Sequence, residues 1–426
     1  MQRKGEIVGA VDFGSRDVRA LIARQDEDGA IQILGHGAAP GKGCVSQGVI
    51  QDLGAAQVAL KQALADAEKE ARLTVQSVFC GINGRNVETF IREERVELDR
   101  EVVEQEHMDE ALQMASRDVL AAGKRVVSSI TSQEWYVDEL RVMDPIGIRG
   151  HVLKTRIHFA RVPSVIEDNI AHCIESQRRE LEDLIFTPIA AALGCLTPED
   201  MELGVAVLDM GQSTTGLAVY RDRRIIGTSC FEWGAYHITR DLAAGLHISF
   251  EEATELMLEY GLAERLIEGG AGMAEALVVG FPGRQTANVP IKLKTVVHGA
   301  PPLASREELE MIIFERAKEL LTKVRQYVHS RGMAKHLVRG VVVAGGAAHI
   351  RNLDKLVESI FQTPCRAGIP EGVEIVPQAA KTSEFVTAVG IARHGFHYRA
   401  AAKNGRVERR SSALRKFSRF IRKYFY

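Results

Sequence analysis

Apolar and polar residues alternate at the start of the chain in a pattern that predicts a run of short strands. Residues 7–13 (IVGAVDF), residues 18–23 (VRALIA) and the stretch AIQILGHG are rich in apolar and β-branched residues, and glycine-containing turns separate them. Such spacing is typical of antiparallel hairpins. Residues 55–72 have the spacing of a helix, and residues 77–82 (SVFCGI) form the apolar run of a buried strand. This part of the chain therefore predicts three strands, a helix and a fourth strand.

The same pattern returns in the second half of the chain. Residues 203–231 again predict strand, Asp-x-Gly turn, strand, turn and strand, and the Asp-x-Gly of 209–211 takes the place of that at 12–14. Two such units indicate an internal duplication of one fold. Between them, residues 84–160 are more charged and break into short segments. We therefore expect an inserted subdomain there.

The remaining elements surround one more glycine turn. Residues 305–331 have the spacing of a long helix that Gly332 ends. Residues 337–361 predict a strand, a Gly-Gly turn and a helix, and residues 385–396 predict a helix with small residues on one face. Strands and helices alternate through the chain, so we expect an α/β protein.

Length and composition exclude several classes of protein. A chain of 426 residues with 46% hydrophobic and 26% charged residues is typical of a globular protein with more than one domain. The six cysteines and the histidines show no disulfide or metal-binding spacing, and no Gly-x-Ser-x-Gly turn supports serine catalysis. No apolar run reaches the roughly 18 residues of a membrane span, so we expect the body of the protein in the cytoplasm.

The end of the chain differs in charge from the body. From residue 406 onward there are eight basic residues and one acidic residue, whereas the remainder holds 46 basic and 55 acidic residues. A mildly acidic body with a basic tail indicates an interaction tail. Residues 400–411 are predicted to be a flexible tether in front of it.

On a helix, at about 100° per residue, residues 413–425 separate into two opposite faces. The apolar face holds Ala413, Leu414, Phe417, Phe420, Ile421, Tyr424 and Phe425, and the basic face holds Arg415, Lys416, Arg419, Arg422 and Lys423. This pattern is typical of a helix that lies on an anionic membrane, and it is too short to span one. Nucleic acid and a partner protein are alternative ligands for such a tail. We favour the membrane, expect no nucleic acid, and expect the segment to be helical only on lipid.

The two Asp-x-Gly turns and the Gly-Gly turn favour phosphate chemistry. Tight turns expose backbone N–H groups that bind phosphate oxygens together with Ser and Thr hydroxyls. An aspartate at each turn can hold Mg²⁺ through water, because Mg²⁺ prefers oxygen ligands and keeps much of its hydration shell. A turn without Cβ atoms lets the backbone approach a base or ribose closely.

These segments resemble the phosphate-1, phosphate-2 and adenosine motifs of the actin/Hsp70/hexokinase superfamily. Within it, essentially the whole chain resembles the FtsA family of bacterial cell-division proteins. The more specific markers are GINGRNV (81–87), SQEWYVDE (132–139), DPIGIRG (144–150), RDLAAGLHISFEEATELMLEYG (240–261), VVVAGGAAHIRNL (341–353) and FVTAVGIARHG (385–395). The resemblance implies an actin-like, duplicated ribonuclease-H-like two-domain fold, with the FtsA-type subdomain 1C in place of the actin subdomain 1B.

The resemblance also implies the domain boundaries. The expected units are subdomain 1A (1–83, 161–199 and 380–399), subdomain 1C (84–160), subdomain 2A (200–238 and 306–379), subdomain 2B (239–305), the linker (400–411) and the membrane-targeting helix (412–426).

The resemblance implies a site for ATP or ADP with Mg²⁺. The first phosphate loop would contain Asp12, Gly14, Ser15 and Arg16, and Arg19 would lie on the next strand. The second phosphate loop would contain Asp209, Gly211, Gln212, Ser213 and Thr214. The residues against the adenosine would be Gly345, Gly346 and Ala347. Asp12 and Asp209 would hold Mg²⁺ through water. No residue that activates water is identified.

Three positions depart from the family pattern. The second phosphate loop usually reads Gly-Gly-Gly-Thr, and here it is residues 211–214 (GQST). An acidic residue commonly follows two positions after that threonine, where this chain has Gly216, and Met257 stands where a lysine is expected. We therefore expect nucleotide binding with weak or absent ATPase activity, and a purely structural nucleotide is the alternative.

By resemblance, the protein would polymerise on the inner face of the cell membrane at the division septum. It would tether FtsZ there through its basic tail and recruit other division proteins through residues 84–160. Arg316 and Glu319 match the residues that bind the FtsZ C-terminal tail; a solvated ion pair one helical turn apart is the alternative interpretation. A kinase-type enzyme and a pilus-assembly protein of the same superfamily are the alternative functions. We identify no catalytic aspartate facing an acceptor pocket, and the pilus relative lacks such a tail.

Overall fold

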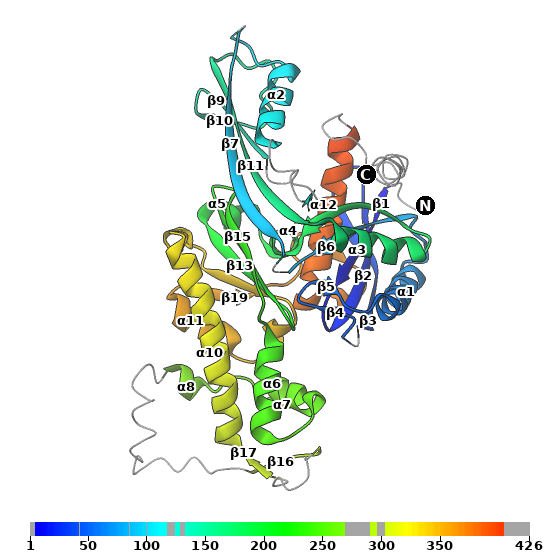
Figure 1. The fold of residues 1–426 in the computed structure, drawn as a ribbon, viewed down its shortest axis with the longest axis vertical. Helices are drawn as coiled ribbons and strands as arrows, with labels where there is room; N and C mark the ends of the chain where they lie inside the picture. The colour runs from blue at the N-terminus through cyan, green and yellow to red at the C-terminus, as the bar shows by residue number, and fades with distance from the viewer. Residues whose placement is uncertain are drawn as a thin grey trace.

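The computed structural model describes residues 5–41, 43–84, 86–99, 101–116, 124–127, 133–268, 290–295 and 303–403. Figure 1 shows an elongated molecule in which two sheet-based domains lie side by side at the centre. The inserted subdomain is at one end of the long axis, and helices α6 and α7 are at the other end.

The first domain is built on a six-stranded sheet in the order β12-β6-β1-β2-β3-β20. Its strands are β1 (Glu6–Phe13), β2 (Asp17–Gln25), β3 (Ile31–Pro40), β6 (Ser77–Ile82), β12 (Glu180–Phe186) and β20 (Glu374–Ile375). The first three form an antiparallel meander, and β6 lies parallel to β1. Helix α1 (Leu53–Ala71) begins where the side chain of Asp52 accepts a hydrogen bond from the amide of Ala55, which satisfies an otherwise unpaired N–H of its first turn.

The second domain repeats this arrangement. Its sheet has the order β15-β14-β13-β18-β19. The strands are β13 (Val205–Met210), β14 (Thr215–Arg221), β15 (Arg224–Phe231), β18 (Val341–Ala344) and β19 (Cys365–Ala367). The first three again form an antiparallel meander, and β18 again lies parallel to the first strand. The duplication that the two Asp-x-Gly units predict is therefore a duplication of sheet topology.

In its described residues, the inserted subdomain is a separate sheet with one helix. It contains β7 (Glu88–Glu97), α2 (Gln105–Ser116), β8 (Lys124–Val127), β9 (Gln133–Val137), β10 (Leu140–Val142) and β11 (Val152–Pro163). Strand β11 pairs with β7, β8 and β9. Val96, Trp135 and Leu153 form part of a small core of its own beside α2, so the described part of the insert has apolar packing separate from that of the two main sheets.

The other elements connect or cover the sheets. They are β4 (Val45–Ser46), β5 (Val49–Ile50), α3 (Ser164–Ser176), α4 (Thr187–Cys195), α5 (Pro198–Leu203), α6 (Ala235–Leu246), α7 (Phe250–Tyr260), α8 (Glu264–Glu268), β16 (Pro290–Lys292), β17 (Leu303–Ser305), α10 (Arg306–Ser330), η3 (Ala334–His336), η4 (Gly346–His349), α11 (Leu353–Phe361), η5 (Gln378–Ala380), η6 (Ser383–Phe385) and α12 (Val386–Lys403).

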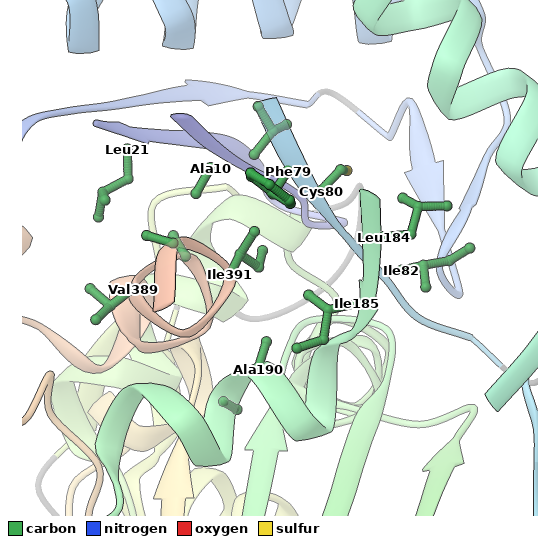
Figure 2. Close-up of a cluster of buried hydrophobic side chains, with 14 of the residues drawn as sticks. Ala10, Leu21, Phe79, Cys80, Ile82, Leu184, Ile185, Ala190, Val389 and Ile391 are labelled. Atoms are coloured by element: carbon green, nitrogen blue, oxygen red, sulfur yellow. The ribbon is translucent and has the colours of Figure 1, made fainter. Parts of the chain in front are cut away.

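Helices α4 and α12 cross between the two domains, and the crossing depends on glycine. A Cβ atom on Gly390 would lie 1.7 Å from the carbonyl oxygen of Ala190, and one on Gly194 would lie 2.0 Å from that of Val386. Figure 2 shows Ala190 of α4 and Val389 and Ile391 of α12 packed beneath the first sheet. The small residues expected on one face of the helix at 385–396 thus let the backbones of α4 and α12 come into contact.

Helix α12 extends past the predicted end of the first domain. The tether was expected to begin at residue 400, but the helix continues to Lys403. Alanines at 400–402 favour helix, and the ammonium of Lys403 forms a 3.0 Å ion pair with Glu6. The tail residues 404–426, including every residue assigned to membrane binding, lie outside the described residues.

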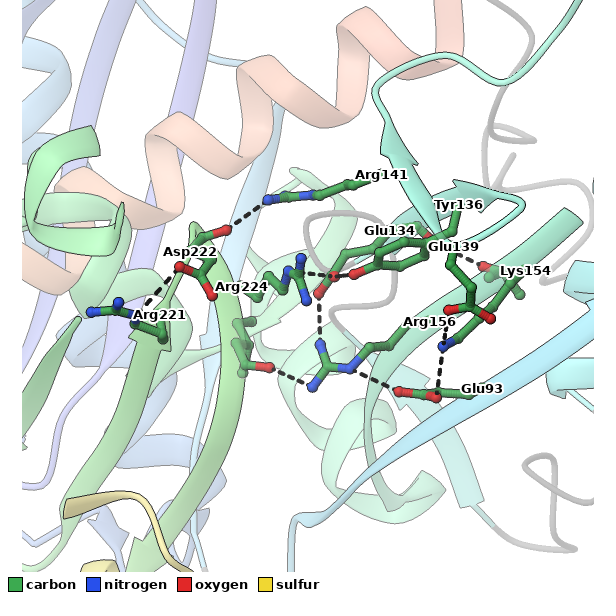
Figure 3. A network of polar contacts seen from close by, with 12 residues as sticks. Glu93, Glu134, Tyr136, Glu139, Arg141, Lys154, Arg156, Arg221, Asp222 and Arg224 are labelled. Carbon is green, nitrogen blue, oxygen red and sulfur yellow. Dashed lines mark hydrogen bonds and ion pairs between the residues drawn. The ribbon is translucent and has the colours of Figure 1, made fainter. Parts of the chain in front are cut away.

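The inserted subdomain also contacts the second domain, along the outer edge of β15 and the turn before that strand. Arg141 donates to the carbonyl oxygen of Asp222 at 2.6 Å, Arg156 donates to that of Ile225 at 3.1 Å, and Thr89 donates to that of Thr228 at 3.1 Å. Figure 3 shows the arginines reaching β15 from the insert. Because an edge strand has unpaired backbone groups, these side chains supply donors that a neighbouring strand would otherwise provide.

Candidate functional site

A cleft lies between the two domains, where the turns after β1 and β13 meet the turn after β18. All three predicted loops contribute to its walls. Of the predicted residues, Asp12, Gly14, Ser15, Arg16, Arg19, Asp209, Gly211, Gln212, Thr214, Gly345, Gly346 and Ala347 line it. The tertiary structure therefore brings together three turns, of which the first and the last are separated by more than half of the chain.

The second phosphate loop contacts the first through its side chains. The hydroxyl oxygens of Ser213 and Ser15 are 2.5 Å apart, and the amide of Gln47 donates to the Ser213 hydroxyl at 2.9 Å. Asn83 donates from Nδ2 to the hydroxyl of Thr214 at 3.1 Å. Where the family commonly has glycine, Ser213 thus joins the two domains at the cleft.

Gly345 occupies a position that requires glycine. Its φ is +82°, and a Cβ atom there would lie 2.7 Å from Oδ1 of Asp209 and 2.7 Å from the carbonyl oxygen of Met210. Its amide donates to the carbonyl oxygen of Ser383 at 3.1 Å. The turn therefore lies directly against the aspartate of the second phosphate loop.

Two half-buried carboxylates, those of Asp12 and Asp209, line the cleft. Burial raises the pKa of Asp12, with Arg19 acting in the opposite direction. Burial, and then the nearby charge of Asp12, raise the pKa of Asp209 to about 7, although a 3.1 Å hydrogen bond from the hydroxyl of Thr387 lowers it. Two carboxylates close enough to interact are suited to hold the waters of one divalent cation.

The cationic groups of the cleft are Arg16 and Arg19. Arg19 is buried, and its Nη2 donates to Asp17 at 2.9 Å and to Glu384 at 3.2 Å. Arg16 is half exposed, and its Nη1 lies 3.5 Å from Oε1 of Glu384. The side chain that joins these two arginines therefore comes from the segment before α12.

Three buried polar atoms at the cleft have no hydrogen-bond partner among the described residues. They are Nε of Arg19, Oδ1 of Asn83 and the hydroxyl of Thr187. Buried polar groups in folded proteins are rarely left unpaired. This set offers a cation, an amide oxygen and a hydroxyl beside two aspartates. Such groups fit a phosphorylated ligand and its hydrated Mg²⁺.

The far wall of the cleft is less polar. Thr239, Thr254, Met257 and Leu258 line it, and the hydroxyl of Thr239 lies 3.8 Å from the sulfur of Met257. Met257, which stands where a lysine is expected, is therefore a buried apolar group in this wall. At Gly216, a Cβ atom would lie 2.7 Å from Pro188, so the acidic side chain common at this position has no room here.

The sequence interpretation missed several cleft residues. They are Gly48, Asn83, Thr187, Glu384 and Thr387. Asn83 and Thr387 lie inside the segments GINGRNV and FVTAVGIARHG, which were recognised as family markers without a role for either side chain. Thr187 and Glu384 stand in no turn motif, and only their spatial position indicates a role.

Arg316 and Glu319 lie on α10, away from the cleft. Nη1 of Arg316 donates to Glu319 at 2.5 Å, and Nε of Arg316 contacts Asp241 of α6. Lys323 donates to Glu319 at 2.6 Å, and this bond lowers the pKa of Glu319. The ion pair one helical turn apart is present, and with Asp241 and Lys323 it forms a charged cluster of four residues.

Solved structures show the class of fold. MreB 5 of Spiroplasma citri bound to AMPPNP matches with a TM-score of 0.55 and 15% identity over 94% of this chain and 98% of that one. The PilM–PilN type IV pilus biogenesis complex matches with a TM-score of 0.61 and 13% identity over 91% of this chain and 98% of that one. The chain has the α/β actin-like fold with an inserted subdomain, as the sequence predicted.

Sequence comparison is more specific. Residues 206–390 match the family model of cell division protein FtsA, and residues 84–160 match that of the SHS2 domain inserted in FtsA. The FtsA of Neisseria meningitidis serogroup B is 28% identical over 393 residues, 92% of this chain and 90% of that protein. The FtsA of Escherichia coli (strain K12) is 26% identical over 428 residues, 99% of this chain and 98% of that protein. The chain belongs to the FtsA family of cell-division proteins.

Proposed function

We propose that the protein binds ATP or ADP with Mg²⁺ in the cleft between its domains. The observation that carries this proposal is the unpaired Arg19 Nε, Asn83 Oδ1 and Thr187 hydroxyl in the same cleft as the two aspartates. The backbone of the turns at 12–16 and 209–214 binds phosphate oxygens, and Asp12 and Asp209 orient the waters of the metal. When it is bound, Mg²⁺ would offset part of the negative charge of the phosphates.

The proposed activity is nucleotide binding with weak or absent hydrolysis. Gly216 and Met257 stand where the family commonly has an acidic residue and a lysine. We assign no described residue to the activation of water. Equilibrium dialysis with radiolabelled ATP, with and without Mg²⁺, tests binding; release of inorganic phosphate from the same samples tests hydrolysis. Rapid turnover would contradict the assignment of a binding protein.

The proposed role is an actin-like scaffold that assembles into filaments on the inner face of the cell membrane at the division septum. The C-terminal helix, residues 412–426, anchors it on anionic lipid. None of the helices in the described part of the chain is long and apolar enough to cross a bilayer. The C-terminal tail of FtsZ binds at Arg316 and Glu319. Other division proteins bind the subdomain at 84–160. Family membership over nearly the whole chain supports this role.

Reversible attachment follows from the size of the tail. Each of its basic residues contributes about 1 kcal/mol on an anionic surface, so one tail binds weakly. Many tails on one filament bind far more tightly through multivalency. Assembly of the protein would therefore control its residence on the membrane.

Co-sedimentation with liposomes tests the anchor. The intact chain is expected to sediment with vesicles that contain anionic lipid, and a chain that ends before Ser411 is expected to stay in solution. A full-length variant with Phe417→Asp and Ile421→Asp keeps every basic residue but loses the apolar face, and it should also stay in solution. Undiminished binding of the truncated chain would overturn the anchor.

A further inference from the structure

We propose that Glu384 weakens the binding of phosphate groups in the cleft, because its carboxylate occupies the two arginines that a phosphate would use. This inference rests on the proposed binding of ATP or ADP and concerns how strongly that same site holds phosphate. Glu384 lies in η6, the short turn that precedes α12, and no turn motif of the sequence includes it.

Glu384 bridges the cleft between the two domains. On the first domain, its Oε2 accepts from Arg19 at 3.2 Å and its Oε1 lies 3.5 Å from Nη1 of Arg16. On the second domain, Nε2 of His349 lies 3.9 Å from Oε1. A Cβ atom on Gly346 would lie 3.8 Å from the same oxygen. The carboxylate therefore stands where the phosphate loop and the Gly-Gly turn face each other.

Both arginines have a second carboxylate partner besides Glu384. Arg19 is buried and is also held by Asp17 at 2.9 Å. Arg16 lies 3.6 Å from the same Asp17 carboxylate. Removing Glu384 would thus leave both cations in place while removing a negative charge beside them. The carboxylate acts as a competitor of the phosphate rather than as a support for the arginines.

The charge of the cleft lining favours this interpretation. Two cations, Arg16 and Arg19, line it together with three carboxylates, those of Asp12, Asp209 and Glu384. A polyanionic nucleotide entering this lining is repelled unless Mg²⁺ accompanies it. Neutralising Glu384 reduces that repulsion without touching the carboxylates assigned to the metal. The repulsion depends on the number of phosphates, so adenosine, which has none, is unaffected.

The test compares Glu384→Gln with the unaltered full-length protein. Gln keeps the size of the side chain and removes its charge. The dissociation constants of Mg-ATP and Mg-ADP are expected to fall by about three- to tenfold, as for one partly exposed charge pair. The affinity for adenosine is expected to stay the same, and the increase in affinity that Mg²⁺ gives to ATP is expected to shrink. Glu374→Gln, an exposed carboxylate outside the cleft lining, is the matched control.

The outcomes separate this inference from the proposed function. If the unaltered protein binds neither ATP nor adenosine, the proposed nucleotide site is wrong. If it binds both and Glu384→Gln leaves the ATP affinity unchanged or lowers it, the competitor role of Glu384 is wrong and the nucleotide site stands. A parallel change in adenosine affinity would mean that the substitution alters the shape of the cleft, which also overturns the competitor role. Glu384→Ala repeats the comparison without a side chain that can form hydrogen bonds.

Discussion

Arg156 of the inserted subdomain donates a hydrogen bond of 3.1 Å to the carbonyl oxygen of Ile225 on the edge strand of the second domain. The same guanidinium donates to the buried Glu134 at 2.6 Å and lies 3.3 Å from Glu93. The side chain of Arg156 therefore links residues within the insert and also connects the insert to the second domain, although the insert interrupts the first domain in the sequence. Figure 3 shows Arg156 at the centre of this network.

Substituting Arg156→Met should loosen the insert from β15. The variant loses the bond to Ile225 and removes one cationic partner from a buried Glu134, at a cost of about 1–3 kcal/mol. Hydrogen exchange should then speed up in β11 and β15 together. The matched control is Arg95→Met on the same sheet, whose side chain and its partner Glu139 are both mostly exposed. Equal protection of β15 in both variants would contradict the role of Arg156.

His158 should make stability depend on pH. Its Nε2 forms a 2.8 Å hydrogen bond with the hydroxyl of Thr228, and burial, aided by the charge of Arg156, lowers its pKa to about 4. The unfolded chain takes up this proton near the ordinary value of about 6.5, so unfolding becomes easier as pH falls from there toward about 4. The loss is at most about 3 kcal/mol.

Urea unfolding of the intact protein and of His158→Gln at several pH values measures this effect. Gln cannot take up a proton in this range, so the difference in stability between the two proteins should change most between about pH 6.5 and pH 4. A difference that stays constant with pH would show that His158 does not carry the effect.

Asp209 should make the stability of the fold depend on pH in the opposite direction. Its pKa is about 7 in the folded protein, against an ordinary value of 3.8. A raised pKa means that the folded chain keeps a proton that the unfolded chain releases, so its contribution to stability is lost as pH rises from about 4 toward 7. In Asp209→Asn, that loss should be absent from urea titrations without nucleotide. Asp222→Asn, whose side chain is half exposed, should behave like the unaltered protein.

The same carboxylate should govern the pH dependence of metal binding. Mg²⁺ binds the deprotonated form, so the affinity for Mg-ATP should rise as pH passes through about 7. Isothermal titration calorimetry at about one pH unit below and above that value measures the change. Asp209→Asn should weaken Mg-ATP binding at both values and remove the slope. A slope that persists in the variant would have to come from another group.

Replacing Gly345 with alanine should abolish nucleotide binding. The substitution adds the strain of a positive φ and drives a Cβ atom against Asp209 and Met210. Gly332→Ala is the control, since Gly332 also has a positive φ (+67°) but no atom stands within 4 Å of its added Cβ. Both variants should lose about 1 kcal/mol from strain alone, and only Gly345→Ala should lose more and fail to bind ATP.

The charged cluster on α10 offers a test of FtsZ recognition. Arg316→Ala and Glu319→Ala should each weaken the binding of a peptide with the FtsZ C-terminal sequence, measured by fluorescence anisotropy, at least several-fold. Glu315→Ala removes an exposed acidic residue from the same helix and should have no effect. If all three variants bind the peptide equally, the cluster is a structural ion network and FtsZ binds elsewhere.

The sequence predicted those parts of the fold that depend on local chemistry. The strands that carry Asp12 and Asp209 near their ends follow from β-branched runs closed by glycine turns, and the structure confirms their antiparallel pairing with the next strand. The helix at 305–331 follows from apolar spacing and is observed as Arg306–Ser330. Each of these signals acts within a few residues, so the sequence alone is sufficient to detect it.

Only the tertiary structure decided which side chains meet across the cleft and across the insert. Glu384 lies beside Arg19, Thr387 reaches Asp209, and Arg156 reaches β15. The partners in each pair are far apart along the chain, and no repeat or turn signal connects them. Such contacts depend on how two folded domains and an inserted subdomain pack, because that packing sets which surfaces face one another. The sequence determined where the glycine turns lie, and the packing of the domains determined which side chains surround the phosphate site that we propose there.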